Sequence, residues 1–271
     1  MNKKVAVEAF REYSALYDTD DIKIKLKIDH TYRVSDIASR IGTSVGADGD
    51  FSWFLGLLHD IGRFEQLTQY GTFKDADSVD HAELGADILF KDGLIENFPT
   101  TFFSKMRLDG LDEPDERDGL DARRIAETAI RLHNKLTLPD GLDEKTLLYC
   151  KILRDADKAD IFRVLTEPPY DERNERIVSD SIFGAVEAAR EDVMNCVHEH
   201  RCVPRRSDFT HFEALISQCC MGFELEFPES VRIVKKQGYL EKLMSLPVEN
   251  AAMRGQLDVL GTEMERAWEN K

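Results

Sequence analysis

Apolar residues recur at helical spacing along most of this chain of 271 residues, and the alternating pattern of a half-buried strand is weak. Residues 4–17 and 30–41 each predict a helix with one apolar side. Residues 51–61 are apolar on nearly every side, which is typical of a helix at the centre of a core. These patterns predict an all-α protein.

Helical spacing continues through the middle of the chain, at residues 81–91, 121–134 and 143–165. Asp121 and Asp143 stand at the start of the last two segments and are expected to cap them. The segments 65–79 and 107–120 are polar and contain glycine, so we expect both to be exposed connections.

The remainder of the chain, residues 176–271, predicts further helices with breaks at 222–228 and at Pro247. We expect a metal-binding catalytic core over residues 1–165 and a helical extension over 166–271. The extension packs on the core or belongs to the same domain. An apolar content of 42% is sufficient for a core of this size.

His59 and Asp60 interrupt the most apolar of these segments. Burying an imidazole and a carboxylate is unfavourable by several kcal/mol unless a partner satisfies both groups. A divalent metal ion would satisfy them together. Gly56 and Gly62 lie on the same stretch and would let a neighbouring backbone or a substrate approach closely.

Three more histidines lie on the apolar faces of predicted helices: His30, His81 and His133. A single histidine in such a position is more often a hydrogen-bonded core residue than a ligand. Several histidines together with carboxylates favour a metal site instead. This mixture suits borderline transition metals, and a carboxylate can bridge two ions.

The acidic segment 154–160 offers a further carboxylate. Asp155 has a lysine about one turn away on either side, which predicts a solvated face. Asp157 has apolar residues one turn away in both directions, so it is predicted to point into the core and to be the ligand. Asp160 lies near the same face and is a candidate to support it.

The composition of the chain disfavours some classes of binding partner. A formal net charge of −16 disfavours binding to duplex nucleic acid or to an anionic membrane. It leaves a small phosphorylated substrate open, because a metal ion can hold phosphate locally. No apolar run reaches membrane-spanning length, and charged residues occupy the start of the chain, so we expect a soluble, cytoplasmic protein. The five cysteines form no CxxC pattern and are interpreted as free or buried thiols.

Four of the singled-out residues occur in a recognisable order: His30, His59, Asp60 and Asp157. This order resembles the H…HD…D motif of the HD-domain superfamily of metal-dependent phosphohydrolases. His81 and His133 are similar to the two additional histidines of its binuclear members. The resemblance covers about residues 20–165 and implies an HD-domain helical bundle, whereas 166–271 matches nothing that assigns a substrate.

The resemblance implies a first ion held by four residues: His30, His59, Asp60 and Asp157. It implies a second ion that shares Asp60 and adds His81 and His133. The cofactors would be one or two divalent transition metal ions, drawn from Fe, Mn, Zn, Ni or Co. A metal-activated water would then be the nucleophile.

Cationic side chains close to the ligands are candidates for binding phosphate: Arg63, Lys74, Lys135 and Lys158. Taken singly, each is more often a surface charge. Arg63 lies one turn after His59, and Arg63 and Asp60 are the predicted catalytic residues. The segment 65–79 joins two ligand helices and is either an active-site lid or an ordinary surface connection.

Three functions are compatible with this pattern. The first is a phosphohydrolase that cleaves a phosphomonoester, a phosphodiester or a nucleotide phosphoanhydride. The second is a di-iron oxygenase of the same fold, since that superfamily contains such members. The third is a non-catalytic, metal-binding regulatory module in which residues 166–271 form the partner surface. Substrate, metal identity and oligomeric state are not determined by these patterns.

Overall fold

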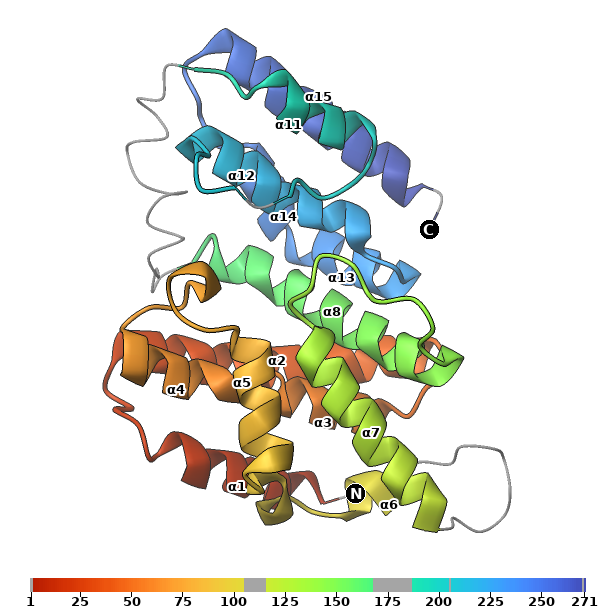
Figure 1. The fold of residues 1–271 in the computed structure, drawn as a ribbon. Helices are drawn as coiled ribbons and strands as arrows, with labels where there is room; N and C mark the ends of the chain where they lie inside the picture. Colours follow the sequence, from red (N-terminus) through yellow and green to blue (C-terminus); the bar gives the residue numbers. More distant parts are fainter. Residues whose placement is uncertain (1, 105–115, 168–186, 205, 270) are drawn as a thin grey trace. The chain divides into compact units, whose positions relative to one another are not determined.

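The computed structural model describes residues 2–104, 116–167, 187–204, 206–269 and 271. Within these ranges every regular element is a helix and there is no strand, which confirms the predicted all-α class (Figure 1). None of the described helices combines the length and apolar character needed to cross a membrane.

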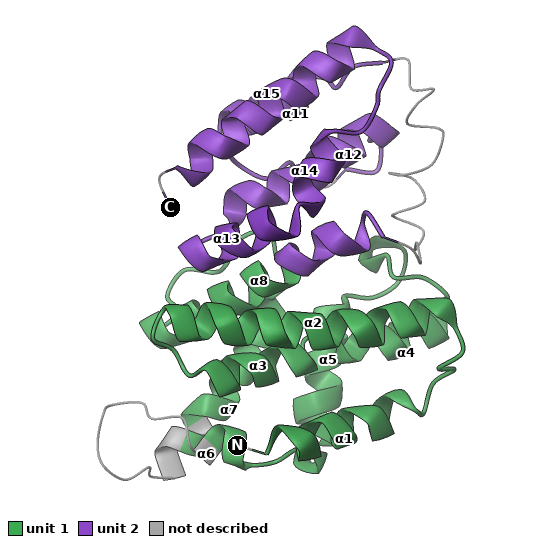
Figure 2. Cartoon of the chain, turned by 180° about the vertical axis from the view of Figure 1, so that it is seen from behind, with its two compact units in different colours: residues 1–157 green, residues 158–271 purple. Residues whose placement is uncertain are grey.

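The chain divides into two compact units, residues 1–157 and 158–271, coloured separately in Figure 2. The first unit contains the following elements: α1 (Lys3–Ser14), α2 (Ile22–Ser44), α3 (Gly49–Leu58), α4 (Ile61–Tyr70), η1 (Asp75–Asp77), α5 (His81–Ala86), η2 (Asp87–Lys91), η3 (Leu94–Asn97), α6 (Thr101–Ser104), α7 (Glu116–Leu132) and the larger part of α8 (Glu144–Val164).

The second unit begins inside α8 and continues with further helices: α11 (Glu191–His198), α12 (His211–Cys219), η4 (Cys220–Glu224), α13 (Pro228–Gln237), α14 (Tyr239–Met244) and α15 (Ala251–Trp268). The expected break at 222–228 is present, because η4 ends there and α13 starts at Pro228. Pro247 lies between α14 and α15, as predicted. All five cysteines are free thiols, and Cys202 alone is partly exposed.

The centre of the first unit is α3, whose residues from Phe51 to Leu58 are all buried. Figure 1 shows α2 lying alongside α3. The two helices meet closely at Gly56, where an added Cβ would lie 2.6 Å from the Cα of Ser35. The close approach predicted for this glycine is therefore confirmed.

Several helix boundaries differ from the predicted ones. Asp21 caps α2, so this helix begins more than two turns before His30. The apolar segment 51–61 is not one helix, since α3 ends at Leu58 and α4 begins at Ile61. The expected connection 65–79 starts only after Tyr70, because Phe64 and Leu67 extend the buried stripe of α4.

The predicted connection 107–120 is only partly within the described residues. Residues 116–120 are helical and belong to α7, so Asp121 lies inside this helix and does not cap it. Residues 107–115 lie outside the described ranges. By contrast, the Asp143 carboxylate accepts a hydrogen bond from the backbone N–H of Thr146 at 2.9 Å, which confirms it as a cap of α8.

Candidate metal centre

The six predicted ligands lie on or directly beside six helices of the first unit and converge on one place. They lie in the middle of α2, at the end of α3, at the start of α4, at the start of α5, just after α7, and on α8: His30, His59, Asp60, His81, His133 and Asp157. The rings of three histidines pack edge to face. His59 lies 5.3 Å from His30 and 5.2 Å from His133 between ring centroids.

The break between α3 and α4 explains how two consecutive residues reach one centre. His59 is the last residue with helical torsion angles after α3, and Asp60 leaves the helical conformation with φ −103° and ψ 17°. The change in chain direction leaves the Nε2 of His59 3.5 Å from the Oδ2 of Asp60. Gly62 then permits contact with the start of α5, because a Cβ there would lie 2.6 Å from the backbone nitrogen of Gly85.

Asp60 lies between two pairs of histidines. Its Oδ2 is 3.7 Å from the Nε2 of His30 and 3.5 Å from the Nε2 of His59. Its Oδ1 is 3.5 Å from the Nε2 of His81 and 3.8 Å from the Nε2 of His133. Each carboxylate oxygen therefore faces its own pair, which is the arrangement of a carboxylate that can bridge two ions.

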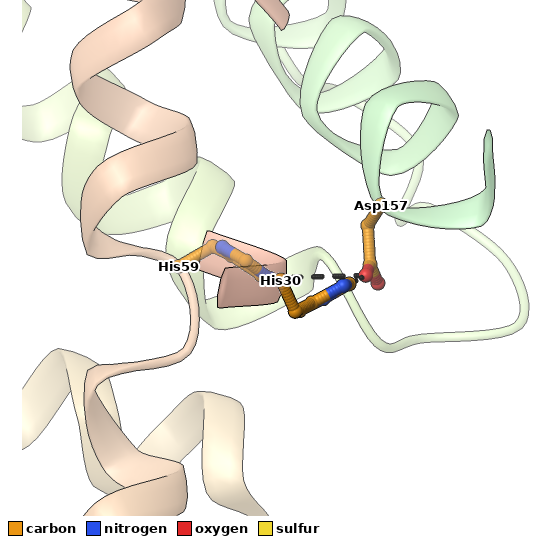
Figure 3. A group of neighbouring side chains, drawn as sticks. All are labelled: His30, His59 and Asp157. Atoms are coloured by element: carbon orange, nitrogen blue, oxygen red, sulfur yellow. Dashed lines mark hydrogen bonds and ion pairs between the residues drawn. The ribbon is translucent and has the colours of Figure 1, made fainter. Parts of the chain in front are cut away.

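Asp157 completes the first of these groups. Its Oδ1 is 3.1 Å from the Nε2 of His30 and 3.7 Å from the Nε2 of His59. Figure 3 shows the ring of His30 directed at this carboxylate, with His59 behind it. His30, His59 and Asp157 have ligand atoms within 4.8 Å of one another, and so do His59, Asp60 and His133.

The predicted exposure of Asp155, a neighbour of Asp157 on α8, is wrong. Asp155 was expected on a solvated face but is fully buried, whereas 16% of the Asp157 side chain is exposed. The two flanking lysines do not mark a solvent face, because α8 is buried around most of its circumference: Lys158 is buried and Lys151 is only partly exposed. Asp160 is also buried.

Backbone carbonyls orient two of the histidines. The Nδ1 of His59 lies 2.7 Å from the carbonyl oxygen of Gly56, and the Nδ1 of His133 lies 2.7 Å from that of Ile130. A carbonyl can only accept, so each ring carries a proton on Nδ1 and turns Nε2 towards Asp60. This is the tautomer in which a histidine binds metal through Nε2.

A carboxylate performs the same task for His81. The Nδ1 of His81 lies 2.9 Å from both oxygens of Asp75, in the segment before α5. Asp75 also accepts hydrogen bonds from Arg63, Gln66 and Asn134. Sequence reasoning missed Asp75, and its position six residues before His81 carries no local signal for this contact.

Asp75, Asp80 and His81 also have ligand atoms close enough to hold an ion. However, the Asp80 carboxylate caps α5 and pairs with Lys135 at 2.5 Å, and Asn134 bridges the two aspartates. We therefore interpret these residues as a hydrogen-bonded support of His81. The connection before α5 is thus part of the site.

Burial and charge set the protonation states. Burial lowers the pKa of His59 to about 4 and that of His81 to about 3, so both rings are neutral near pH 7. Burial would raise the pKa of Asp60, but the nearby Lys27 and His59 outweigh it and hold that pKa well below its usual range. The hydrogen bond from His30 similarly lowers the pKa of Asp157 against the effect of burial.

The residues fit a bound divalent ion. The Nε2 of His59 is buried and has no hydrogen-bond partner among the described residues, although leaving such an atom unsatisfied is costly. It points at two carboxylates that are ionised at neutral pH. A metal ion between these groups would satisfy the orphaned nitrogen, and neutral imidazoles with carboxylates suit borderline transition metals.

Two cationic side chains lie within the site. Lys27 is 4% exposed, and its Nζ donates to the Oδ2 of Asp60 at 2.8 Å. Sequence reasoning missed Lys27, although its place three residues before His30 on the same helix puts both on one face. The predicted Arg63 is buried, with Nε 3.6 Å from the Oδ1 of Asp60 and Nη1 donating to the carbonyl of Phe73.

The other candidate cations are engaged with carboxylates. Lys74 lies 3.5 Å from Asp77, and the partner of Lys135 is described above. Lys158, in the second unit, lies 2.7 Å from Glu224. These pairs favour structural roles for the three lysines over contacts with phosphate.

Comparison with known proteins agrees with this geometry. The model of the HD domain family matches residues 28–161, a range that contains all six predicted ligands and Arg63. No curated protein and no solved structure matches the chain significantly.

Proposed function

Because residues 28–161 belong to the HD domain family, we propose that this chain is a metal-dependent phosphohydrolase acting on a small phosphorylated molecule. The bond cleaved would be that of a phosphomonoester, a phosphodiester or a nucleotide phosphoanhydride. The observation that carries the proposal is the placement of Asp60, with each carboxylate oxygen facing a separate pair of histidines.

In this proposal the site holds two ions. The first would be bound by four residues: His30, His59, Asp60 and Asp157. The second would be bound by Asp60, His81 and His133. Bound divalent ions would supply Lewis-acid chemistry, which activates water near neutral pH and offsets charge on phosphate oxygens. The ligand types suit Fe, Mn, Zn, Ni and Co.

The protein's own groups prepare the site for this chemistry. The Gly56 and Ile130 carbonyls keep a proton on the Nδ1 of His59 and of His133, so that each Nε2 remains a donor to metal. Asp75 does the same for His81. In this reading a contact of Arg63 with substrate stays a prediction, since its Nη1 donates to protein acceptors in the structure.

A metal and activity analysis of one preparation tests the proposal. The protein is purified without added metal, its metal content is measured by mass spectrometry, and the same sample is assayed on a panel of phosphate esters and anhydrides. We expect bound transition metal and hydrolysis, both lost in H59A and D60A. Full hydrolysis by a metal-free sample would contradict the proposal.

Matched substitutions of exposed residues distinguish loss of the metal site from a general effect of substitution on the protein. His198 and Asp20 are exposed and are not among the six ligands, so H198A and D20N should retain the metal content and the activity of the wild type. If these controls lose metal as the site variants do, the assignment of the ligands is wrong.

The same preparation discriminates the other two hypotheses. A di-iron oxygenase would consume oxygen when loaded with iron and would not hydrolyse the panel. A non-catalytic regulatory module would bind metal without either activity. Hydrolysis that disappears in H81A while the first ion is retained would support the binuclear phosphohydrolase.

A further inference from the structure

Lys27 is a buried cation that the proposed metal chemistry does not use. Its Nζ lies 2.8 Å from the Oδ2 of Asp60, one of the proposed metal ligands, and 5.4 Å from the centre of the Phe73 ring. Burying an ammonium group is costly unless an anion accompanies it. On α2 the neighbouring Lys25 is exposed and Lys23 is partly exposed, so burial of Lys27 is specific to its place on the helix.

The position of the ammonium group is informative. The Oδ2 atom that it contacts is the oxygen that faces His30 and His59. A metal ion held by these two histidines would bind to the same oxygen, and two cations at one carboxylate oxygen repel each other strongly inside a protein. Lys27 therefore occupies the carboxylate oxygen that the first ion would use.

Displacement of Lys27 would leave a buried ammonium group beside two bound ions. A phosphate oxygen held at the ions would lie beside this group and could pair with it. Lysine suits this exchange, since its flexible stem lets one point charge move between two acceptors.

We infer that Lys27 is an exchangeable cation, which neutralises Asp60 in the metal-free protein and binds the anionic group of the substrate once metal is bound. This inference rests on the proposed function for the presence of metal and a phosphorylated substrate. It makes Lys27 a substrate-binding residue and a competitor of the first ion.

The test compares K27M with the wild type in two calorimetric titrations. In the first, Mn²⁺ is added to chelator-stripped protein, and we expect K27M to bind it at least about tenfold more tightly because the competing charge is gone. In the second, inorganic phosphate is added to Mn²⁺-loaded protein, and we expect K27M to bind it at least about tenfold more weakly. An unchanged or weaker Mn²⁺ affinity overturns the inference, and so does an unchanged phosphate affinity.

Two further variants serve as controls. Lys25 is exposed on the same helix and lies 3.5 Å from Asp20, so K25M should match the wild type in both titrations. K27R keeps the charge and should show no gain in Mn²⁺ affinity. A gain in K25M or K27R equal to that of K27M also overturns the inference.

A measurement on the wild type is independent of whether K27M folds. Amine labelling read by mass spectrometry should modify Lys27 faster after Mn²⁺ is added and more slowly again after phosphate is added. A labelling rate that does not rise with Mn²⁺ overturns the inference. Wild-type protein that takes up no metal contradicts the proposed function itself, whereas a metal-loaded, active wild type with K27M unchanged contradicts only the role of Lys27.

Discussion

Replacing Gly62 by alanine tests whether metal binding depends on the close packing of α4 against α5. Gly62 lies in the first turn of α4, two residues after Asp60, and faces the start of α5, which carries His81. An alanine Cβ would lie 2.6 Å from the backbone nitrogen of Gly85, while ordinary van der Waals contact begins at 3.4 Å. The backbone carbonyl oxygen of His81 would lie closer still. The two helices must therefore separate by more than about 0.8 Å, because both contacts are with backbone and no flexible side chain is available to move instead.

A shift of that size is larger than a metal site tolerates, since ligand distances are held within about 0.2 Å. Asp60 moves with α4 and His81 moves with α5, so the expected loss is in the second ion. His30, His59 and Asp157 do not lie on either helix, so three of the four ligands of the first ion keep their places and this ion should be weakened less than the second. Overpacking against backbone should also lower the free energy of unfolding by roughly 1–3 kcal/mol.

The assay measures the metal stoichiometry of G62A by mass spectrometry and its stability by denaturant unfolding of metal-free protein. G255A is the matched control. Gly255 lies inside α15, and a Cβ there would meet no atom within 4 Å. This variant should bind two ions and be unchanged or more stable by about 0.5–1 kcal/mol. A G62A protein that holds both ions with wild-type stability would refute the reasoning.

Three further predictions concern the surroundings of the ligands. In D75N the His81 ring loses its anionic partner, so calorimetric Mn²⁺ titration should show the second ion bound about 10–100-fold more weakly and the first ion unchanged; equal weakening of both ions would contradict this role. Burial lowers the pKa of His59 to about 4 from 6.5, so the unfolded chain takes up this proton first on acidification. Metal-free protein should therefore lose stability as the pH falls from about 6.5 towards 4, and equal denaturation midpoints at about pH 7 and 5 would argue against it. At a free metal concentration of 100 times Kd, bound metal stabilises the folded protein by about 2.7 kcal/mol. Removing the metal with a chelator should therefore lower the melting temperature of the wild type, and the melting temperature of D60A should not change.

Part of the fold could be predicted because helices are specified by neighbouring residues. The 3.6-residue spacing of apolar side chains predicted the helical class, and Asp143 marked the start of α8. The predicted helix boundaries were wrong where the apolar spacing was ambiguous. His59 and Asp60 are polar residues at the end of an apolar run, and nothing local shows that the helix ends at Leu58.

The site residues were predictable for a different reason. A buried histidine or aspartate on an apolar face stands out in a sequence, and the order His30, His59, Asp60 and Asp157 follows a family motif. Asp155, the first aspartate of α8, shows the limit of predicting burial from local charge. It was expected to be solvated because a lysine flanks it on either side, but burial on a helix depends on what covers each side, and here Lys158 is buried and Lys151 is only partly exposed.

The sequence by itself determined that this protein is helical, that residues 28–161 match the HD domain family, and which six side chains are candidates for binding metal. The tertiary structure alone decided which oxygen of Asp60 faces which histidines, that Asp75 supports His81, and that Lys27 contacts Asp60. The physical reason is that helix periodicity is local. The distances between side chains on different helices depend instead on close packing, such as the contacts permitted by Gly56 and Gly62, which no single segment of sequence encodes.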